Sequence, residues 1–477
     1  MISGAPSQRP DEPILTTRRG FWLVIALYVL ISAVIWLNFD GPTRLKYSGD
    51  GDSWYQPSIG LYLHGGFVYP ESPDTPSIYR PPAFPVFAAA MFSIAGGPSP
   101  NAIAVGQIVL LLLVGLIFRA TVNDWLPGWG DIGMGLFIFN PNVLTIAQYV
   151  QSDTLFLFFV TIAMWAMLRY ARGETGWRYP VLVGVALALA CLTRPTAQFL
   201  ILVLPLAFPL LDVVNGNGAM WRRGLLKGAA ATVLALLMLF PWAHHVKQLE
   251  GSYGLSSAEI RSRYIWDQIS IIEAQHSGLS YHEAENKQPV QHAVVEARYG
   301  EKWKAMNESQ RHAAILREGY DILLSYPASE LAVAYARSII QFFAAGGSGR
   351  WHYLLLDDPD RLAEAWFRTK QTDVAGIVAR FLGGTSPVAI VASAVCIVFA
   401  VVARLVGLIG LVAIARRRSW AMLLTIVSII SYFALVHLFV GNSRYRISIE
   451  PALMLLFLHG IEAMWRRWRS SGLTVRR

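Results

Sequence analysis

The stretch FWLVIALYVLISAVIWL, residues 21–37, decides the fold class of this chain. It carries no charged residue, and it is too long for the apolar core of a secretory signal peptide. No evident cleavage site follows it. We therefore expect this stretch to remain in the protein as a first membrane span.

The composition of the whole chain also indicates a membrane protein. Of 477 residues, 54% are hydrophobic and only 15% are charged, with a mean hydropathy of +0.42. That apolar content exceeds what a soluble core requires. The net charge of +9 does not indicate nucleic-acid binding, because Lys and Arg cluster beside apolar runs, where orientation in the bilayer explains them. Cys191 and Cys396 lie inside apolar segments and predict neither a disulfide nor a metal pair.

Apolar runs long enough to cross the hydrocarbon recur along the chain, since a spanning helix needs about 20 such residues. They predict an all-α polytopic bundle of about ten transmembrane helices. The expected spans are 21–38, 101–119, 132–149, 154–170, 179–193, 196–213, 224–243, 387–415, 420–440 and 447–465. The run FPVFAAAMFSIA, residues 84–95, is too short to span comfortably and is expected to lie at the interface.

Arginines orient these spans, because short cytoplasmic loops collect Lys and Arg. They flank alternate ends: Arg18 and Arg19 before the first span, Arg169, Arg172 and Arg178 after the fourth, Arg222 and Arg223 after the sixth, Arg416 to Arg418 after the eighth, and Arg466, Arg467 and Arg469 after the tenth. Both termini are therefore expected in the cytoplasm. The opposite, outer face receives residues 38–100, 150–153, 244–386 and 441–446.

Four parts follow from this pattern. They are a cytoplasmic tail 1–20, a transmembrane module 21–243 with the outer loop 38–100, a mainly helical outer segment 244–386, and C-terminal spans with a tail, 387–477. Within the outer segment, amphipathic patterns predict helices, and ASELAVAYARSIIQFFAA, residues 328–345, is expected at the interface because Glu330 and Arg337 interrupt it. The exact number of spans between 244 and 415 stays open.

Charged residues gather at the outer ends of the predicted spans. An ionisable group near hydrocarbon costs several kcal/mol unless it is paired or wetted, so such groups favour a functional role. The acids are Asp50, Asp52 and Asp153, and the arginines are Arg80, Arg194, Arg444 and Arg446. Although distant in sequence, they are expected to line one cavity.

This composition suits group transfer from an anionic phosphate donor. Arginine's planar fork holds phosphate oxygens bidentately and stays charged, so it binds a lipid phosphate and stabilises it as a leaving group. A carboxylate accepts the proton of an attacking hydroxyl or amine while a sugar carbon passes through an oxocarbenium-like state. The bilayer gives the donor's prenyl tail an apolar environment.

Four sequence stretches carry a family resemblance, together with the acids and aromatics of the first outer loop. They are YRPPAFPVF (79–87), QYVQSDTLFLF (148–158), LTRPT (192–196) and SRYRISIEPALMLL (443–456). In this order they resemble the GT-C glycosyltransferases, within which the chain is most similar to the bacterial branch related to protein O-mannosyltransferases and aminoarabinose transferases. The resemblance covers most of 20–213 and returns over 420–465.

The resemblance implies a polyprenyl-phosphate sugar donor, an outer-face active site and an inverting transfer. It places the first-loop catalytic acid on Asp52 or Asp50 and a second acid on Asp153. The family usually spaces its first acid four residues before an aromatic, whereas Asp52 stands three before Tyr55 and Asp50 five before it. The base therefore stays open between the two, with Asp52 preferred.

The resemblance assigns Arg80, Arg444 and Tyr445 to the donor phosphate. Arg446 and Arg194 join them as phosphate-binding candidates from their outer position, although Arg194 in LTRPT could only shape a short hairpin between spans. No metal ligand is assigned, because QYVQSDTLF offers Asp153 no nearby second acid. Some GT-C relatives use a divalent cation, so that cofactor is left open.

Other roles for the same residues stand beside these. Asp50 and Asp52 could be turn or cap residues, and Asp153 could cap the fourth span. Arg444 and Arg446 could anchor the tenth span at the interface. The chain would then be a non-catalytic assembly partner. A transporter of a lipid-linked or anionic solute is a further alternative, but it predicts charges along a path across the bilayer and not on one face.

The expected setting is the bacterial inner membrane, with the active site facing the periplasm. The expected partners are the lipid-linked sugar donor, membrane lipids and an acceptor that is a glycan, a lipid or a protein. The sequence leaves open the identity of the sugar, the class of acceptor and the oligomeric state.

Overall fold

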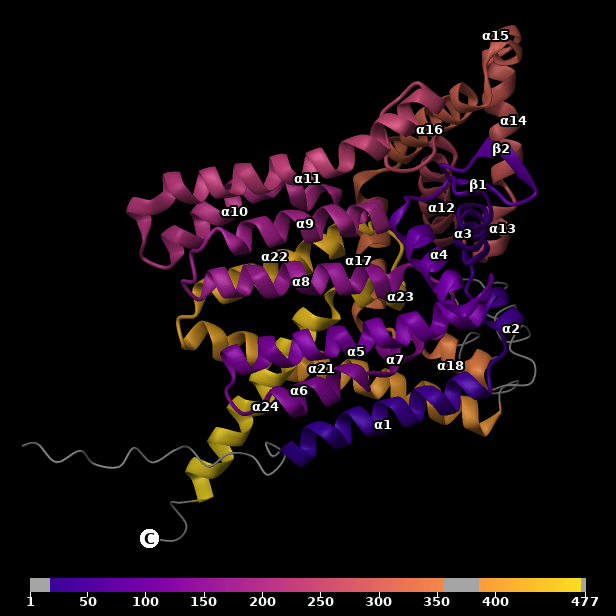
Figure 1. Ribbon diagram of the computed structural model, residues 1–477. Coiled ribbons are helices and arrows are strands. Elements are labelled where there is room, and N and C mark those ends of the chain that lie inside the picture. The colour runs from indigo at the N-terminus through magenta and orange to yellow at the C-terminus, as the bar shows by residue number, and fades with distance from the viewer. Residues whose placement is uncertain (1–17, 356–385, 473–477) are drawn as a thin grey trace, which may run out of the picture.

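The computed structural model describes residues 18–355 and 386–472, and its regular structure is almost entirely helical. Long helices run side by side across the molecule, and shorter elements gather at one end of this bundle (Figure 1). The start of helix α1 and the end of helix α24 lie at the opposite end. The predicted all-α polytopic fold is confirmed. Residues 1–17, 356–385 and 473–477, which include most of the predicted N-terminal tail and part of the outer segment, lie outside the described residues.

Nine long helices of the described residues form the bundle. They are α1 (Arg18–Leu37), α5 (Pro100–Trp125), α8 (Asp153–Ala171), α9 (Arg178–Thr193), α10 (Gln198–Val214), α11 (Trp221–Glu250), α21 (Pro387–Arg416), α22 (Trp420–Val436) and α24 (Glu450–Gly472). Across the described ranges, seven helices are long and apolar enough to cross a membrane, and three shorter apolar helices accompany them. This agrees with the prediction of about ten.

The predicted span 132–149 is not one helix. It is divided into α6 (Gly130–Ile138) and α7 (Pro141–Ile146), and the chain then leaves helical geometry before α8. Proline has no N–H to donate and disfavours helical backbone in the residue before it. Asn140 accordingly has a ψ of 121°, and its side-chain oxygen accepts the Asn142 N–H at 3.0 Å to begin the second helix.

The first outer loop folds into several short elements. They are α2 (Gly41–Lys46), α3 (Asp52–His64), the antiparallel strands β1 (Val68–Tyr69) and β2 (Ser72–Pro76), and α4 (Ala83–Ala95). Trp54 and Phe84 pack edge to face between α3 and α4, with ring centroids 5.5 Å apart. The loop is thus a packed layer at one end of the bundle, and the interfacial position of α4 stays a prediction.

The outer segment is a second group of helices at the same end. It contains α12 (Ala258–His276), α13 (Tyr281–Glu285), α14 (Gln288–Tyr299), α15 (Glu301–Ala305), α16 (Glu308–Ser325), α17 (Ala328–Ala344) and α18 (Ser348–Leu355). Its apolar core includes Trp266, Ile269 and Ala314, and reaches Phe439 at the end of the bundle. The described part of this segment is therefore packed onto the membrane helices, while the interfacial position of α17 stays a prediction.

A buried arginine ties the first loop to the bundle. The Arg44 guanidinium is fully buried and donates to the Asn101 side chain, to the Gln148 backbone carbonyl and to the Trp36 carbonyl, each at 2.8 Å. Burial lowers the pKa of Arg44 to about 10. Because a buried cation is costly unless its donors are satisfied, these oxygens fix the ends of three segments against one another.

A second buried charge group lies inside the bundle. One carboxylate oxygen of Glu450 accepts hydrogen bonds from the Arg446 Nε, at 2.7 Å, and from the Arg404 Nη2, at 2.8 Å. Its other oxygen accepts a hydrogen bond from the Asn140 side-chain amide at 3.1 Å. Arg446 also donates to the carbonyls of Phe342 and Phe343. This group joins α24 to α21, to α17 and to the break before α7.

We expect Glu450→Gln to destabilise the fold strongly. The substitution leaves two buried guanidinium groups without their counter-charge, which costs about 3–5 kcal/mol when one partner of a buried pair is removed. Thermal unfolding in detergent should show a clearly lower midpoint. As a control, Glu308→Gln alters a side chain that is 90% exposed and should change stability by no more than about 0.5 kcal/mol. Equal midpoints for the two variants would contradict this assignment.

Candidate active site

Two irregular loops bring the first pair of acids together. In the first, Gly51 is required, because a Cβ there would lie 1.7 Å from the Ser48 hydroxyl and 2.8 Å from the Val150 carbonyl oxygen. The Gln151 side chain of the second loop donates to the Ser48 carbonyl. The two loops therefore touch backbone to backbone, which places Asp50 beside the start of α8.

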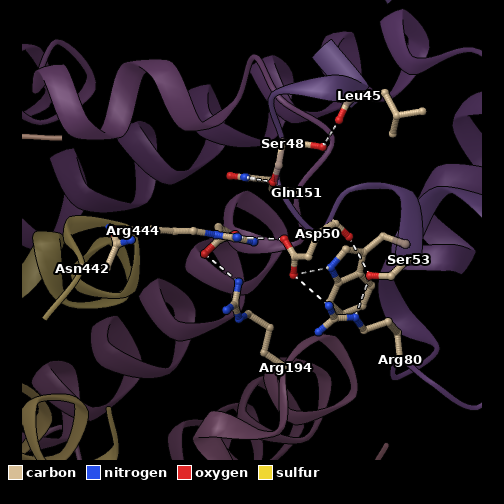
Figure 2. Close-up of polar contacts among 11 residues, drawn as sticks. Leu45, Ser48, Asp50, Ser53, Arg80, Gln151, Arg194, Asn442 and Arg444 are labelled. Carbon is tan, nitrogen blue, oxygen red and sulfur yellow. Dashed lines mark hydrogen bonds and ion pairs between the residues drawn. The ribbon is translucent and has the colours of Figure 1, made fainter. Parts of the chain in front are cut away.

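Asp50 lies between two arginines, as Figure 2 shows. One carboxylate oxygen is 3.0 Å from the Arg80 Nη2, and the other is 2.8 Å from the Arg444 Nη1. The Trp54 indole N–H also points at Asp50, at 3.3 Å. Asp50 thus joins the first outer loop to the entrance of the last span.

Asp153 continues this arrangement from the first turn of α8. The Arg444 Nε and Nη2 both reach one of its oxygens at 2.9 Å, and the Arg194 Nη1 reaches the other at 2.7 Å. Arg444 is itself positioned by its backbone N–H, which donates to the Asn442 side chain at 2.9 Å. The five charged residues Arg80, Asp50, Arg444, Asp153 and Arg194 alternate in sign, and we call them the charge chain.

Arg80 is held rigidly at one end of the charge chain. Its Nε donates to the Ser53 hydroxyl at 2.9 Å, and its guanidinium lies over the ring of Trp54 at 4.8 Å and that of Tyr79 at 5.1 Å. Aromatic faces attract a guanidinium and exclude water beside it. The guanidinium is therefore oriented before any ligand arrives.

The electrostatics of Asp50 differ from those of an isolated buried acid. Burial by itself would raise the pKa of its carboxyl, but the positive charges of Arg444, Arg80 and Arg194 outweigh that effect and hold the pKa well below its usual range. The Asp50 side chain keeps 27% of its surface exposed. It is thus an ionised carboxylate that a ligand can reach.

Asp52 does not join the charge chain. It is exposed in the first turn of α3, where it accepts a hydrogen bond from the Gln56 amide four residues later, at 2.9 Å. The preference for Asp52 over Asp50 therefore finds no support in the geometry. Arg446 is also directed elsewhere, into the bundle and onto Glu450.

Tyr445 lies beside the charge chain. The Arg194 guanidinium is 5.7 Å from its ring centroid, and the ring stacks on that of His437 at 4.5 Å. Tyr445 and His437 thus form a stacked aromatic pair beside the site.

Arg350 is a residue that sequence reasoning missed. It lies on the short helix α18, where its Nη1 donates to the Asn142 side chain at 3.1 Å, and both Arg444 and Asp153 act on it electrostatically. The surrounding sequence GGSGRWHY carries no pattern of charge or hydropathy that marks it. Only the packing of α18 against α7 brings it to the site.

Residues of the outer segment approach the same site through Tyr79. The Arg263 side chain of α12 is hydrogen-bonded to Tyr79, the neighbour of Arg80, and Asp267 one turn later bonds to Gln288. Burial raises the pKa of Asp267 to about 6, the charge of Glu285 adds to this rise, and Arg263 opposes it. Sequence reasoning did not single out these residues either.

The candidate active site offers few side chains that could bind a metal ion. Among the residues that the structure describes, no group of three or more His, Cys, Asp or Glu side chains comes together. The carboxylates of Asp50 and Asp153 are both engaged by arginines. The charge chain by itself is suited to bind an anion.

A family match indicates the class of protein. Residues 79–245, roughly a third of the chain, match the family described as dolichyl-phosphate-mannose-protein mannosyltransferase. The matched part contains Arg80, Asp153 and Arg194 of the charge chain. The match confirms the resemblance to the GT-C glycosyltransferases, and with it the predicted enzyme class, a glycosyltransferase of GT-C type.

Solved structures of membrane glycosyltransferases are also similar. ArnT from Cupriavidus metallidurans bound to undecaprenyl phosphate aligns over 93% of this chain and 78% of its own, at 13% identity and a TM-score of 0.40. The oligosaccharyltransferase AglB from Archaeoglobus fulgidus, in complex with an inhibitory peptide and a dolichol-phosphate, aligns over 96% of this chain and 52% of its own, at 14% identity and a TM-score of 0.47. No curated protein matches the sequence.

We expect Gly51→Ala to loosen the contact between the two acid-bearing loops. The added methyl group meets backbone and hydroxyl atoms, and overpacking of this kind costs about 1–3 kcal/mol. Limited proteolysis of purified protein should cut the first outer loop faster in this variant. Gly97→Ala, which adds a methyl group in open space on the same face, is the matched control. An unchanged cleavage rate in Gly51→Ala would show that the added methyl group does not loosen the contact between the two loops.

Proposed function

We propose that this protein transfers a sugar from a polyprenyl-phosphate donor to an acceptor at the periplasmic face of the bacterial inner membrane, with inversion at the sugar carbon. The observation that carries the proposal is the charge chain. Three arginines and two carboxylates from four distant segments meet at the end of the bundle that holds the outer segment. Such a group is costly beside hydrocarbon unless a ligand or water uses it.

The donor phosphate would bind at the arginines. A guanidinium presents a planar fork of N–H groups that fits two phosphate oxygens, and it stays charged at any relevant pH. Arg80, Arg194 and Arg444 already point N–H groups toward a common region filled by two carboxylates. Positive charge in place before the reaction stabilises the phosphate as the leaving group.

The prenyl tail of the donor has an apolar space below the site. A cavity of about 160 Å³ lies between α8, α9, α10 and α22, and its lining includes Val160, Met164, Leu204, Leu424 and Ile429. Along α8 this lining begins two turns after Asp153, a rise of about 10 Å toward the bundle centre. A chain attached to a phosphate at the charge chain could enter it.

Asp50 is the residue we assign as general base. In the free enzyme its pKa is too low for efficient proton abstraction, because arginines surround it. A bound phosphate would form ion pairs with the same arginines and add negative charge next to Asp50. Both effects raise the pKa of the Asp50 carboxyl. Donor binding thus prepares the base.

The reaction is then a single displacement. The acceptor oxygen or nitrogen attacks the anomeric carbon, its proton passes to Asp50, and the bond from that carbon to the phosphate oxygen breaks with its electrons remaining on the phosphate. Asp153 holds Arg444 and Arg194 in position for this step. The products are the glycosylated acceptor and the polyprenyl phosphate.

The acceptor would approach from the outer segment. Arg263 and Asp267 lie on α12, next to Tyr79 and therefore next to Arg80. Arg263 can donate hydrogen bonds and Asp267 can accept them, next to the position where the anomeric carbon of the sugar would lie. We therefore assign them to acceptor binding.

We expect Asp50→Asn to lower kcat by about 100-fold or more, because an amide cannot take the acceptor's proton. Sugar transfer is measured with purified protein and radiolabelled lipid-linked sugars extracted from bacterial membranes. Donor binding is measured in a separate experiment. Asp52→Asn, two residues away and exposed, is the matched control and should retain turnover. If Asp52→Asn were the inactive variant, the base would be Asp52 and the present assignment would be wrong.

A pH-dependent effect is expected at Asp267. Its carboxyl is neutral below pH 6 and ionised above it, since burial has raised its pKa. Asp267→Asn should therefore raise the acceptor KM about tenfold at pH 8, the cost of one charged hydrogen bond, and change it little at pH 5. The donor KM is the internal control. An equal effect at both pH values would show that ionisation of Asp267 does not contribute.

A further inference from the structure

Arg350 carries a positive charge that no carboxylate in the described part of the chain neutralises. Its guanidinium has five N–H donors, and the acceptor that the structure gives it is the neutral amide oxygen of Asn142, at 3.1 Å. No described Asp or Glu oxygen lies within 4 Å of it. A cation in this position is costly unless an anion arrives, so the residue itself points to a ligand.

The position of Arg350 is fixed by its neighbours. The Tyr149 hydroxyl donates to the Arg350 carbonyl at 2.7 Å, and the Trp351 indole donates to the Pro141 carbonyl at 3.0 Å. These bonds attach α18 to α7 and to the loop that precedes Asp153. The backbone at Arg350 is therefore fixed without a ligand, and the Asn142 side chain orients the guanidinium.

The groups that face Arg350 are both positive and negative. They are Arg444, Asp153, Tyr149 and Arg446. Burial, together with the repulsion from Arg444, lowers the pKa of Arg350 to about 10, which leaves the residue charged at physiological pH. Arg446 is neutralised by Glu450 at 2.7 Å and belongs to the bundle interior.

We propose that Arg350 completes an anion site of net charge +2, and that this site is matched to the doubly charged phosphate of the leaving lipid and not to the singly charged phosphate of the donor. The charge count takes four arginines, Arg80, Arg194, Arg350 and Arg444, against the two carboxylates Asp50 and Asp153. The inference rests on the proposed function and adds to it which charge state of the lipid the site prefers.

This charge has a chemical consequence for the transfer step. The donor is a phosphodiester with one negative charge, and breaking its bond to the sugar carbon leaves a monoester that gains a second one. A site with two positive charges binds that developing charge better than it binds the donor. Arg350 therefore contributes more to the transition state than to the ground state.

Binding of two lipids that differ by this one charge tests the inference. Farnesyl phosphate, a monoester, is compared with its methyl ester, a diester that keeps one charge at every pH used. Wild-type protein in detergent should bind the monoester about tenfold tighter at pH 8, equivalent to about 1.4 kcal/mol. The preference should vanish at pH 5, since the second ionisation of a phosphate monoester lies near pH 6.

Two variants assign the preference to Arg350. Arg350→Gln should bind both lipids with nearly equal affinity, and Arg350→Lys, which restores the charge without the planar fork, should recover part of the preference. Arg337→Gln changes an exposed arginine of the same segment and should behave like wild type. A structural role for Arg350 would weaken both lipids alike.

The outcomes separate the two levels of the proposal. Equal affinity of the wild-type protein for both lipids at pH 8 would overturn the charge match and leave the lipid-phosphate donor standing. A preference that persists in Arg350→Gln would remove Arg350 from the site. Failure of the wild-type protein to bind either lipid would overturn the proposed function itself.

Discussion

The bridge that Arg444 makes between Asp50 and Asp153 is the contact on which this end of the molecule depends. It joins the first outer loop, the start of α8 and the entrance of the last span, of which the first and last lie almost 400 residues apart in the sequence. Each of these charges would be costly alone beside hydrocarbon. Their pairing fixes the relative position of three segments.

The chain meets the cost of buried charge in three different ways. Arg44 is satisfied by neutral oxygens. Glu450, with no exposed side-chain surface, is enclosed by two arginines. The charge chain differs from both, because Asp50, Arg80, Arg194 and Arg444 remain partly exposed and, with Arg350, positive charge is in excess among the described residues. That difference separates charges that hold the bundle together from charges available to a ligand.

Under the proposed function, the same pairing would let an ionised carboxylate become a base once the donor binds. Arginines that suppress the basicity of Asp50 in the free enzyme are those that a lipid phosphate would engage. In this proposal, binding of the donor would change the proton affinity of the carboxylate that activates the acceptor. This coupling needs no moving domain, since it follows from the sharing of Arg80 and Arg444 between two anions.

Sequence alone determined the membrane bundle, because hydropathy is a local property that a run such as 21–37 carries in itself. It also named all five members of the charge chain, since charges at the outer ends of spans are unusual wherever they occur. Tertiary structure alone separated Asp50, which contacts Arg80 and Arg444, from Asp52, which begins a helix and contacts Gln56. It likewise turned Arg446 inward and brought Arg350 to the site. The direction of a side chain depends on which distant segment offers a partner, and no local pattern records that.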